Sequence, residues 1–593
     1  MSRLRVAGGL GAAPRWRRTA LEVLAALASG AALAAAFPAP DIGPLALVAL
    51  VPLLLLVETT RPVKAAALGY LAGLTFFGLH LLWIAQFLSW TGAVAWLAWG
   101  ALSAIQAAFI AAFFALVPAT RRLGAWRLLV LPACWAVLEL VRAHHPMGGF
   151  PWGLLAISQH DAGPLLPLAR VIGGFGLAAV IVAVNLAVAF WLNALLARPA
   201  LAGDGGPLAG RGQRPQGPEE PRSGGWGRWA ALAGLPVLAA GLLAARVAVP
   251  AAPAPSGPPM DVVVVQGGLR GGRGLAQGLT TERVFANHVR LTETVALIPG
   301  DPPDLVVWGE GAADADPLAS PDRLAEVGRA AAAAKAPILL GATTRVDDTH
   351  RATEGLLFTA GGQLADRYRK RRLVPFGEFV PLGGLLGRLI PATREGVPYD
   401  KVPGRRLEPL LIDGVPVGTL ICWESAYPGD ARQLTRDGAR VLLIMTNNAS
   451  FGTGAGPRQH LAAGQLRAVE AGRTIVQAAV TGISAVIEPT GATRQETGLY
   501  RETVLRAGLS PRDGRTLYVR YGRGIEAGLV GVAVGGMVLS GLLWWRRRPG
   551  GVGRPGPSAR LREAQSAGRR ARPAPNAQTV PDRGDMVPPV RKP

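Results

Sequence analysis

Three reactive side chains of different types stand at the ends of short predicted strands. Glu310 ends the run DLVVWGE, Cys422 ends GTLIC, and Lys370 lies in YRKRRLVPFGEF. If folding brings them together, the ammonium favours the thiolate, and the carboxylate takes the thiol proton and later returns it. The ammonium, with backbone N–H donors near Trp423, can also stabilise an oxyanion. These residues predict acyl transfer through a cysteine nucleophile.

Each of these residues also has a non-catalytic interpretation. A single buried cysteine usually packs as a small hydrophobe, Glu310 could be a capping or surface carboxylate, and Lys370 could be one solvated charge among RYRKRR. The chain has two cysteines, too few for a disulfide scaffold. The second, Cys134, lies inside an apolar segment without a charged neighbour, and we expect it only to pack.

The elements that must position these residues lie between about 258 and 515, where short β-branched runs alternate with helical patterns. This alternation predicts an α/β domain with buried sheets, which we place at 251–518. The expected strands are 261–266, 304–310, 336–343, 415–424, 440–447 and 484–489, and the expected helices are 281–297, 319–335 and 458–472.

The rest of the chain has the composition of a membrane protein. Half of the residues are hydrophobic, and the basic residues behind the net charge of +23 fall mostly at the edges of apolar segments and in the C-terminal tail. This distribution argues against nucleic-acid binding and for a polytopic helical membrane domain. About eight segments are long enough to span the bilayer as helices, at 19–37, 42–58, 65–87, 91–118, 126–142, 167–197, 229–249 and 524–545.

The first segment could instead be a cleaved signal peptide, because LAAAFPAP loosely resembles a cleavage site. The next apolar segment follows at once, which favours a retained anchor. We therefore expect a helical domain with seven spans at 1–250, including a Gly/Pro/Arg cytoplasmic loop at 198–228. A final span at 519–548 and a disordered, basic, Pro-rich tail at 549–593 complete the predicted organisation.

Basic residues in alternate loops predict the orientation of these spans. They precede the first span and lie between the second and third, the fourth and fifth, and the sixth and seventh, whereas the other short loops carry few apart from Arg142. The positive-inside rule then places the N- and C-termini in the cytoplasm and the α/β domain outside it.

One stretch of the membrane part contains charged and aromatic residues that a simple membrane anchor would not need. Glu139 and Arg142 are three residues apart on one predicted helix face, and Phe150 and Trp152 follow in GGFPWG. The two charges could form a sheltered structural ion pair, or these four residues could contact a lipid headgroup or substrate. Both hypotheses stay open at this stage.

Together with their surroundings, the three reactive residues resemble the Glu–Lys–Cys triad of the nitrilase superfamily. The matching segments are VVWGEG, YRKRRLVPFGEFVPL and LICWES, followed by the block QHLAAGQLRAVEAGR and then TGISA. LVPFGEFVPL, joined to the many predicted spans and to WAVLELVR and GFPW, is similar to the apolipoprotein N-acyltransferase family. The resemblance covers roughly residues 20–545.

This resemblance implies an αββα sandwich for the α/β domain and an acyltransferase function. Cys422 would accept an acyl chain from a phospholipid as a thioester, and the α-amino group of a diacylglyceryl-cysteine at an apolipoprotein N-terminus would then attack it. Glu310 would act as general base and acid and Lys370 as electrostatic stabiliser, with Glu378, Trp423 and Glu424 supporting the site. Neither a metal nor a cofactor is implied. The expected location is the bacterial inner membrane, with the α/β domain in the periplasm.

The chain departs from the family pattern at several positions outside the triad. The family usually has WPES where Gly309 stands, QGN where Gly268 stands, and an Asn-Asp-Ala-Trp-Phe run where Asn448 and Ser450 stand. Gln477 and Val480 replace a common Arg and Asn. We expect these differences to affect lipid preference or rate rather than the type of reaction.

Two other functions stay possible from the sequence. A membrane-tethered amidase of the nitrilase superfamily would resolve the thioester with water, although LVPFGEFVPL and GFPW argue against it. A non-catalytic, diverged copy would keep the fold and bind lipoproteins. A transporter is disfavoured because the spans carry few central ionisable residues.

Overall fold

The computed structural model describes residues 14–546, apart from 162, 197–225, 269–276, 382–387, 389–392 and 395–396. Of the described residues, those up to Ser540 belong to one compact unit, and those from Gly541 onward belong to a second. Most of the predicted loop at 198–228 and the whole predicted tail at 549–593 lie outside the described residues. The expectations for these two segments, and the domain boundaries themselves, stay predictions.

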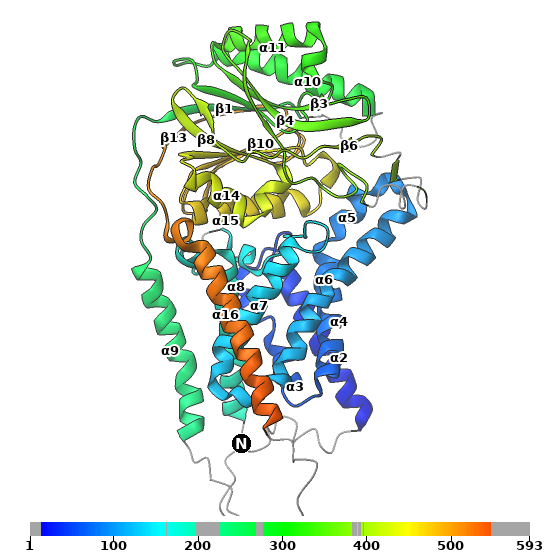
Figure 1. The fold of residues 1–593 in the computed structure, drawn as a ribbon, viewed down its shortest axis with the longest axis vertical. Helices are drawn as coiled ribbons and strands as arrows, with labels where there is room; N and C mark the ends of the chain where they lie inside the picture. Colours follow the sequence, from blue (N-terminus) through cyan, green and yellow to red (C-terminus); the bar gives the residue numbers. More distant parts are fainter. Residues whose placement is uncertain are drawn as a thin grey trace, which may run out of the picture. The chain divides into compact units, whose positions relative to one another are not determined.

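The α/β domain contains two sheets packed face to face (Figure 1). The first has the order β13-β1-β2-β3-β4-β5, with β6 paired to β4; its strands are β1 (Met260–Gln266), β2 (Leu305–Trp308), β3 (Ile338–Arg345), β4 (His350–Phe358), β5 (Leu364–Arg369), β6 (Asp400–Lys401) and β13 (Thr503–Leu509). The second has the order β12-β11-β10-β9-β8-β7; its strands are β7 (Leu410–Ile412), β8 (Val415–Ile421), β9 (Val441–Thr446), β10 (Ile475–Ala479), β11 (Ala485–Ile487) and β12 (Thr493–Glu496).

Alternate side chains of each strand pack into different layers. In β1, Val262 and Val264 join the core between the sheets, whereas Val263 and Val265 join the core under α10 (Gln277–Glu293) and α11 (Pro321–Ala334). The outer face of the second sheet packs on α14 (Pro428–Arg436) and α15 (Gly456–Ala471). This is the period of two expected of strands buried on both faces. The αββα sandwich is therefore confirmed.

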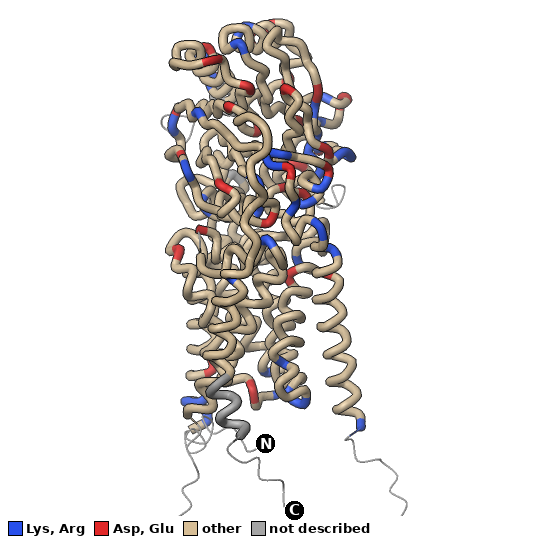
Figure 2. Tube along the Cα trace, turned by 90° about the vertical axis from the view of Figure 1, so that its left-hand side faces the viewer, with Lys and Arg blue, Asp and Glu red and all other residues tan. Residues whose placement is uncertain are grey.

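The described residues include six helices long and apolar enough to cross a membrane: α2 (Arg15–Ala35), α4 (Pro62–His80), α6 (Ala93–Ala119), α7 (Arg127–His144), α8 (Ala169–Leu196) and α16 (Leu517–Trp545). Two shorter apolar helices run over Gly43–Val57 and Gly234–Ala248, the latter within α9 (Trp226–Ala248). Figure 2 shows few charged residues along these helices between their ends. The apolar helices confirm a membrane protein.

Several predicted spans have different boundaries in the structure. The segment expected at 42–58 is a 3-10 turn, η1 (Gly43–Leu47), followed by the short helix α3 (Val51–Val57). The segment expected at 65–87 is broken at Leu81, which separates α4 from α5 (Leu82–Phe87). Apolar composition alone does not reveal such breaks, because both sides of a kink are equally hydrophobic.

The lower face of the α/β domain shares one buried core with the membrane helices (Figure 1). Trp423 and Leu466 of the α/β domain belong to the same apolar cluster as Leu155 and Phe175 of the helical part. A polar contact crosses the same junction, where the backbone N–H of Gly174 donates to the Glu470 carboxylate at 2.6 Å. The membrane helices therefore help to position the strand ends of the second sheet.

Candidate active site

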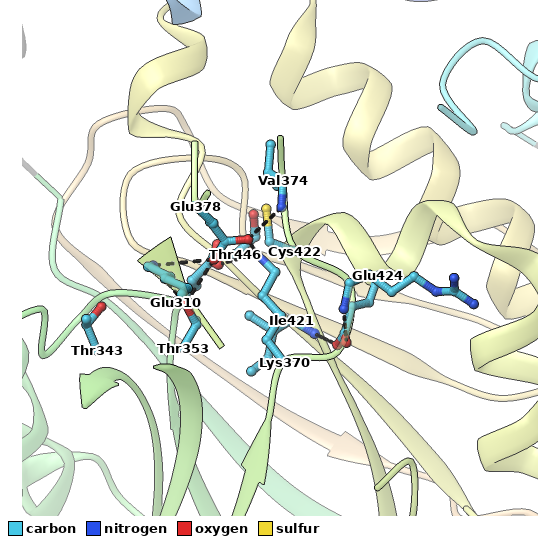
Figure 3. A network of polar contacts seen from close by, with 12 residues as sticks. Glu310, Thr343, Thr353, Lys370, Val374, Glu378, Ile421, Cys422, Glu424 and Thr446 are labelled. Atoms are coloured by element: carbon cyan, nitrogen blue, oxygen red, sulfur yellow. Dashed lines mark hydrogen bonds and ion pairs between the residues drawn. The ribbon is translucent and has the colours of Figure 1, made fainter. Parts of the chain in front are cut away.

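Cys422 stands at a sharp turn between the buried strand β8 and a short 3-10 helix, η8 (Cys422–Ala426). Its φ is +50°, a left-handed conformation that costs a non-glycine residue roughly 1 kcal/mol. The Ser425 hydroxyl stabilises the turn by donating to the Cys422 carbonyl at 2.8 Å. The Glu310 carboxylate and the Thr446 hydroxyl are close enough to the thiol to act on its pKa (Figure 3). The turn thus presents the sulfur to a potential base.

Lys370 places its ammonium between two carboxylates. The Nζ atom lies 2.7 Å from Glu310 Oε1 and 2.9 Å from Glu378 Oε2, and Lys370 is only 1% exposed. An ammonium so far from water needs such partners to offset the cost of its desolvation. Glu310 and Cys422 follow β2 and β8, and Lys370 follows β5, so the structure brings the three predicted reactive residues together.

Burial and charge set the protonation states of this cluster. Burial lowers the pKa of Lys370, but the Glu310 and Glu378 carboxylates outweigh it and hold that pKa well above its usual value. Burial raises the pKa of Glu378, yet the Lys370 and Lys401 ammonium groups bring it to about 2. An ion pair therefore persists at neutral pH.

The thiol behaves differently from the expectation based on a nearby ammonium. Burial is the largest cause, and with the Glu310 carboxylate it raises the pKa of Cys422 to about 12, against the opposing effect of Lys370. The ammonium lowers the pKa of the thiol, as predicted, but burial and the Glu310 carboxylate raise it by more. At neutral pH this side chain is a thiol, so an attack by its sulfur would require a base, and Glu310 is a carboxylate close enough to act on it.

Two further carboxylates hold the segments that carry the reactive residues. The buried Glu424 side chain accepts from the Ile421 N–H at 2.8 Å, the Arg371 N–H at 2.7 Å and the Tyr368 hydroxyl at 2.9 Å. It therefore ties the turn at Cys422 to the segment that follows Lys370. Glu378 accepts in addition from the Val374 N–H at 2.9 Å and from the Thr353 hydroxyl at 2.9 Å.

Aromatic side chains from both parts of the chain pack beside Cys422. Trp423 stacks on Trp152 with ring centroids 5.4 Å apart and planes 8° from parallel, and Phe150 lies 5.3 Å from Trp423. Trp83 packs 5.1 Å from Trp152 and 4.4 Å from Phe451. An apolar wall next to a thiol suits an acyl chain better than a polar substrate.

Glu139 and Arg142 support the loop that carries this wall. Arg142 donates to the carbonyl oxygens of Trp152 at 2.7 Å and of Phe150 and Gly153 at 3.1 Å, and Glu139 accepts from the Leu155 N–H at 2.8 Å. Their own ion pair is long, at 4.0 Å, and both side chains are buried. This geometry favours the structural hypothesis for the pair over a lipid contact.

Sequence reasoning missed two polar residues next to the nucleophile. Thr446 ends β9, so the rule that found Glu310 and Cys422 could have found it too. His460 lies on α15, with Nε2 3.1 Å from the Cys422 carbonyl oxygen, and burial lowers its pKa to about 4. It is neutral at pH 7 and stabilises the turn. Among the described residues, no group of three or more His, Cys, Asp or Glu is placed to hold a metal ion.

The departures from the family pattern fall mainly in tightly packed backbone around the site. A side chain at Gly309 would lie 2.7 Å from the Thr446 carbonyl oxygen, and one at Gly268, with φ of +39°, would lie 2.4 Å from the Arg501 backbone. Asn448 has φ of +60° and contacts His460 at 3.1 Å. The remaining departures are the buried Gln477 and Val480 and the exposed Ser450.

The sandwich, the buried ion pair and the apolar helices together define a membrane-bound enzyme with a carbon-nitrogen hydrolase fold. The family model of the apolipoprotein N-acyltransferase N-terminal domain matches residues 29–187, and that of carbon-nitrogen hydrolase matches residues 287–517. The chain belongs to the apolipoprotein N-acyltransferase family.

The assignment to this family rests on curated relatives. The apolipoprotein N-acyltransferase of Geobacter metallireducens is 30% identical over 511 residues, covering 84% of this chain and 92% of the relative. That of Pseudomonas aeruginosa is 32% identical over 542 residues, covering 89% and 96%. Among solved structures, a carbon-nitrogen hydrolase from Helicobacter pylori matches at 15% identity with a TM-score of 0.33, covering 42% of this chain and 89% of that one. An amidase from Nesterenkonia sp. matches at 18% identity with a TM-score of 0.30, covering 45% and 94%.

Proposed function

We propose that this enzyme transfers an acyl chain from a membrane phospholipid, through a thioester on Cys422, to the α-amino group of the N-terminal diacylglyceryl-cysteine of an apolipoprotein. The observation that carries the proposal is the buried Lys370 ammonium between Glu310 and Glu378, with the Glu310 carboxylate close enough to the Cys422 thiol to act on its pKa. The relatives' names supply the acceptor, because they act on apolipoproteins.

In the first half-reaction, Glu310 takes the Cys422 proton as the sulfur attacks the ester carbonyl carbon of the donor lipid. The oxyanion that forms is stabilised by the Lys370 ammonium. When the intermediate collapses, the carbon–oxygen ester bond breaks, and Glu310 gives its proton to the departing alkoxide. A lysophospholipid leaves, and the acyl chain stays on sulfur.

In the second half-reaction, the α-amino group of the acceptor attacks the thioester carbon. Glu310 takes a proton from the amine, and the collapse of the intermediate forms an amide and expels sulfur, which receives that proton. The enzyme is then back in its starting state, and the atoms and protons of the two half-reactions balance without an oxidant, a reductant or a metal ion. The Trp423 and Trp152 wall would lie along the acyl chain during both steps.

We further propose that the site lies on the periplasmic side of the bacterial inner membrane, with both termini in the cytoplasm. The basic residues at 15–18, 61–64 and 121–127 support this orientation, since they lie at the starts of α2, α4 and α7. Both substrates are lipids, which explains why a sandwich of soluble type stands on many apolar helices. The proposed domain boundary at 250/251 lies just after the end of α9 at Ala248, and the one at 518/519 lies two residues after the start of α16 at Leu517.

A two-substrate assay tests the proposed function. The full-length enzyme in proteoliposomes receives phospholipid with a labelled acyl chain and a synthetic diacylglyceryl-cysteine peptide, and we expect the label on the α-amino group of the peptide. A peptide with an acetylated amine is the matched control and should stay unlabelled. Label released only as free fatty acid would favour the amidase-like hydrolase, and label left entirely on phospholipid would favour a non-catalytic lipoprotein-binding protein.

A further inference from the structure

A cavity of about 550 Å³ lies between the α/β domain and the loop that follows α7. Met147, Gly148 and Gly149 line it from the helical part, and the segments around Arg371 and Lys401 line it from the α/β domain. We propose that this cavity binds the phosphodiester group of the acyl-donor phospholipid, with Arg371 as its principal ligand. The inference rests on the proposed function and adds the part of the donor that the enzyme recognises.

The charge of the cavity wall suits a phosphodiester. Arg371, Arg372 and Lys401 line it, together with a single carboxylate, Asp400, which is paired to Arg394 at 2.9 Å. Three cations therefore face one carboxylate that is already neutralised. Guanidinium groups bind phosphate oxygens through directed, charge-assisted hydrogen bonds, whereas an ammonium supplies only a point charge.

Arg371 is the least engaged of the three cations. Arg372 holds Asp430 with two contacts, at 2.8 and 3.1 Å, and lies over the Tyr427 ring at 4.2 Å. Lys401 contacts the Thr353 hydroxyl at 2.7 Å and Glu378 at 3.3 Å. The Arg371 guanidinium has one long ion pair, 3.7 Å from Asp430, so most of its donors can serve a ligand.

The backbone that carries this cation is held to the turn at Cys422, because Glu424 also accepts from the Ile421 N–H. Arg371 directly follows Lys370, and its N–H is fixed by the Glu424 carboxylate at 2.7 Å. In a phospholipid, only the glycerol unit separates the ester carbonyl from the phosphodiester. A donor whose carbonyl meets Cys422 and Lys370 could therefore place its phosphate near Arg371.

The far wall of the cavity places it at the depth of lipid headgroups. Met147–Gly149 follow the end of α7 at His144, and the Tyr427 hydroxyl donates to the Gly148 carbonyl at 3.0 Å. The cavity thus lies at the junction between the apolar helices and the polar domain, and we infer that this junction would be at the depth of the phosphates in a bilayer. A lipid that enters from the membrane would meet it with its headgroup.

The test compares two donors in the acyl-transfer reaction of the full-length enzyme. Arg371→Gln should raise the KM for phosphatidylglycerol about tenfold, the size expected for one charge-assisted hydrogen bond, with kcat unchanged. With p-nitrophenyl palmitate, which has no phosphate, the variant should match the wild type within about twofold. Arg371→Lys should recover part of the phospholipid affinity, and Arg406→Gln, which removes an exposed guanidinium paired to Glu408, is the matched control.

Competition separates the possible sources of phosphate. Glycerophosphoglycerol should inhibit the wild type competitively against phospholipid and inhibit Arg371→Gln far less. Inhibition by inorganic phosphate but not by glycerophosphoglycerol would point to a free-phosphate site and overturn the proposal. If Arg371→Gln lost the same activity with both donors, Arg371 would only position the catalytic residues, and the proposal would fail. A raised KM for the peptide acceptor alone would assign the cavity to the acceptor and would also overturn the proposal. A wild type inactive with both donors would instead remove the proposed function on which this inference rests.

Discussion

Replacing Cys422 by serine should lower acyl transfer to the diacylglyceryl peptide by at least about a thousandfold. A serine hydroxyl is a far weaker acid than a thiol, and Glu310 already faces a thiol whose pKa is raised to about 12. The oxygen nucleophile would therefore be much harder to deprotonate, and an oxyester would be less reactive toward an amine than a thioester. The rate of label transfer in proteoliposomes measures the effect.

The other cysteine provides the control. Cys134 is buried in α7, and Cys134→Ser should leave transfer within about twofold of the wild type. Both variants should insert into membranes and show unchanged thermal unfolding midpoints. A Cys422→Ser enzyme with near-normal transfer would rule out the sulfur as the acyl carrier.

Replacing Lys370 by methionine should abolish detectable transfer and destabilise the α/β domain by about 3–5 kcal/mol at neutral pH. The substitution removes the ammonium between Glu310 and Glu378, which leaves Glu310 without this counter-charge and Glu378 with only Lys401, 3.3 Å away. It also removes the cation that stabilises the oxyanion in both half-reactions. Thermal unfolding in detergent and the transfer assay measure the two effects separately.

The loss of stability should depend on pH with a definite sign. In the wild type, the pKa of Glu378 is about 2, below the value of about 4.3 in an unfolded chain, so this group adds stability above pH 4.3 that is lost as pH falls toward 2. Without Lys370, that pKa would rise, because burial raises it and only Lys401 and the Val374 N–H still lower it, so the variant would gain less stability than the wild type as pH rises above about 4.3. The difference should therefore be widest at neutral pH and narrow toward pH 4.

The exposed Lys335 at the end of α11 gives a matched substitution. Lys335→Met should change neither the unfolding midpoint nor the transfer rate. If Lys370→Met unfolded like the wild type at pH 7, the buried ion pair would contribute nothing to the fold, and the arrangement of charges proposed for catalysis would lose its support.

Local sequence patterns predicted much of the sandwich, because its inner strands are short apolar runs with clear ends. β1, β2, β3, β8, β9 and β11 were all expected, whereas β7, β12, β13 and the buried β10 were not. The hairpin of β4 and β5 was missed, since β5 reads LADRYR and exposes most of its side chains. Strands at such a sheet edge carry charges that hide the apolar alternation, and only their pairing with a buried neighbour defines them.

The site was predictable where chemistry follows the end of a strand, and not where it depends on distant packing. Glu310 and Cys422 were found from their positions after apolar runs, whereas the positions of Glu378 and Glu424 were inferred only from a resemblance. The contact between Trp152 and Gln459 joins residues 307 positions apart, and no local pattern could indicate it. The roles assigned to all of these residues stay predictions.

Mass spectrometry of the acyl-enzyme tests the central claim most directly. Full-length enzyme incubated with phospholipid alone should gain the mass of one acyl chain on the peptide that contains Cys422, hydroxylamine should remove it, and added diacylglyceryl peptide should discharge it as an amide. No adduct on Cys422 in folded protein that still transfers acyl chains, or an adduct on another residue that the peptide discharges, would contradict the account.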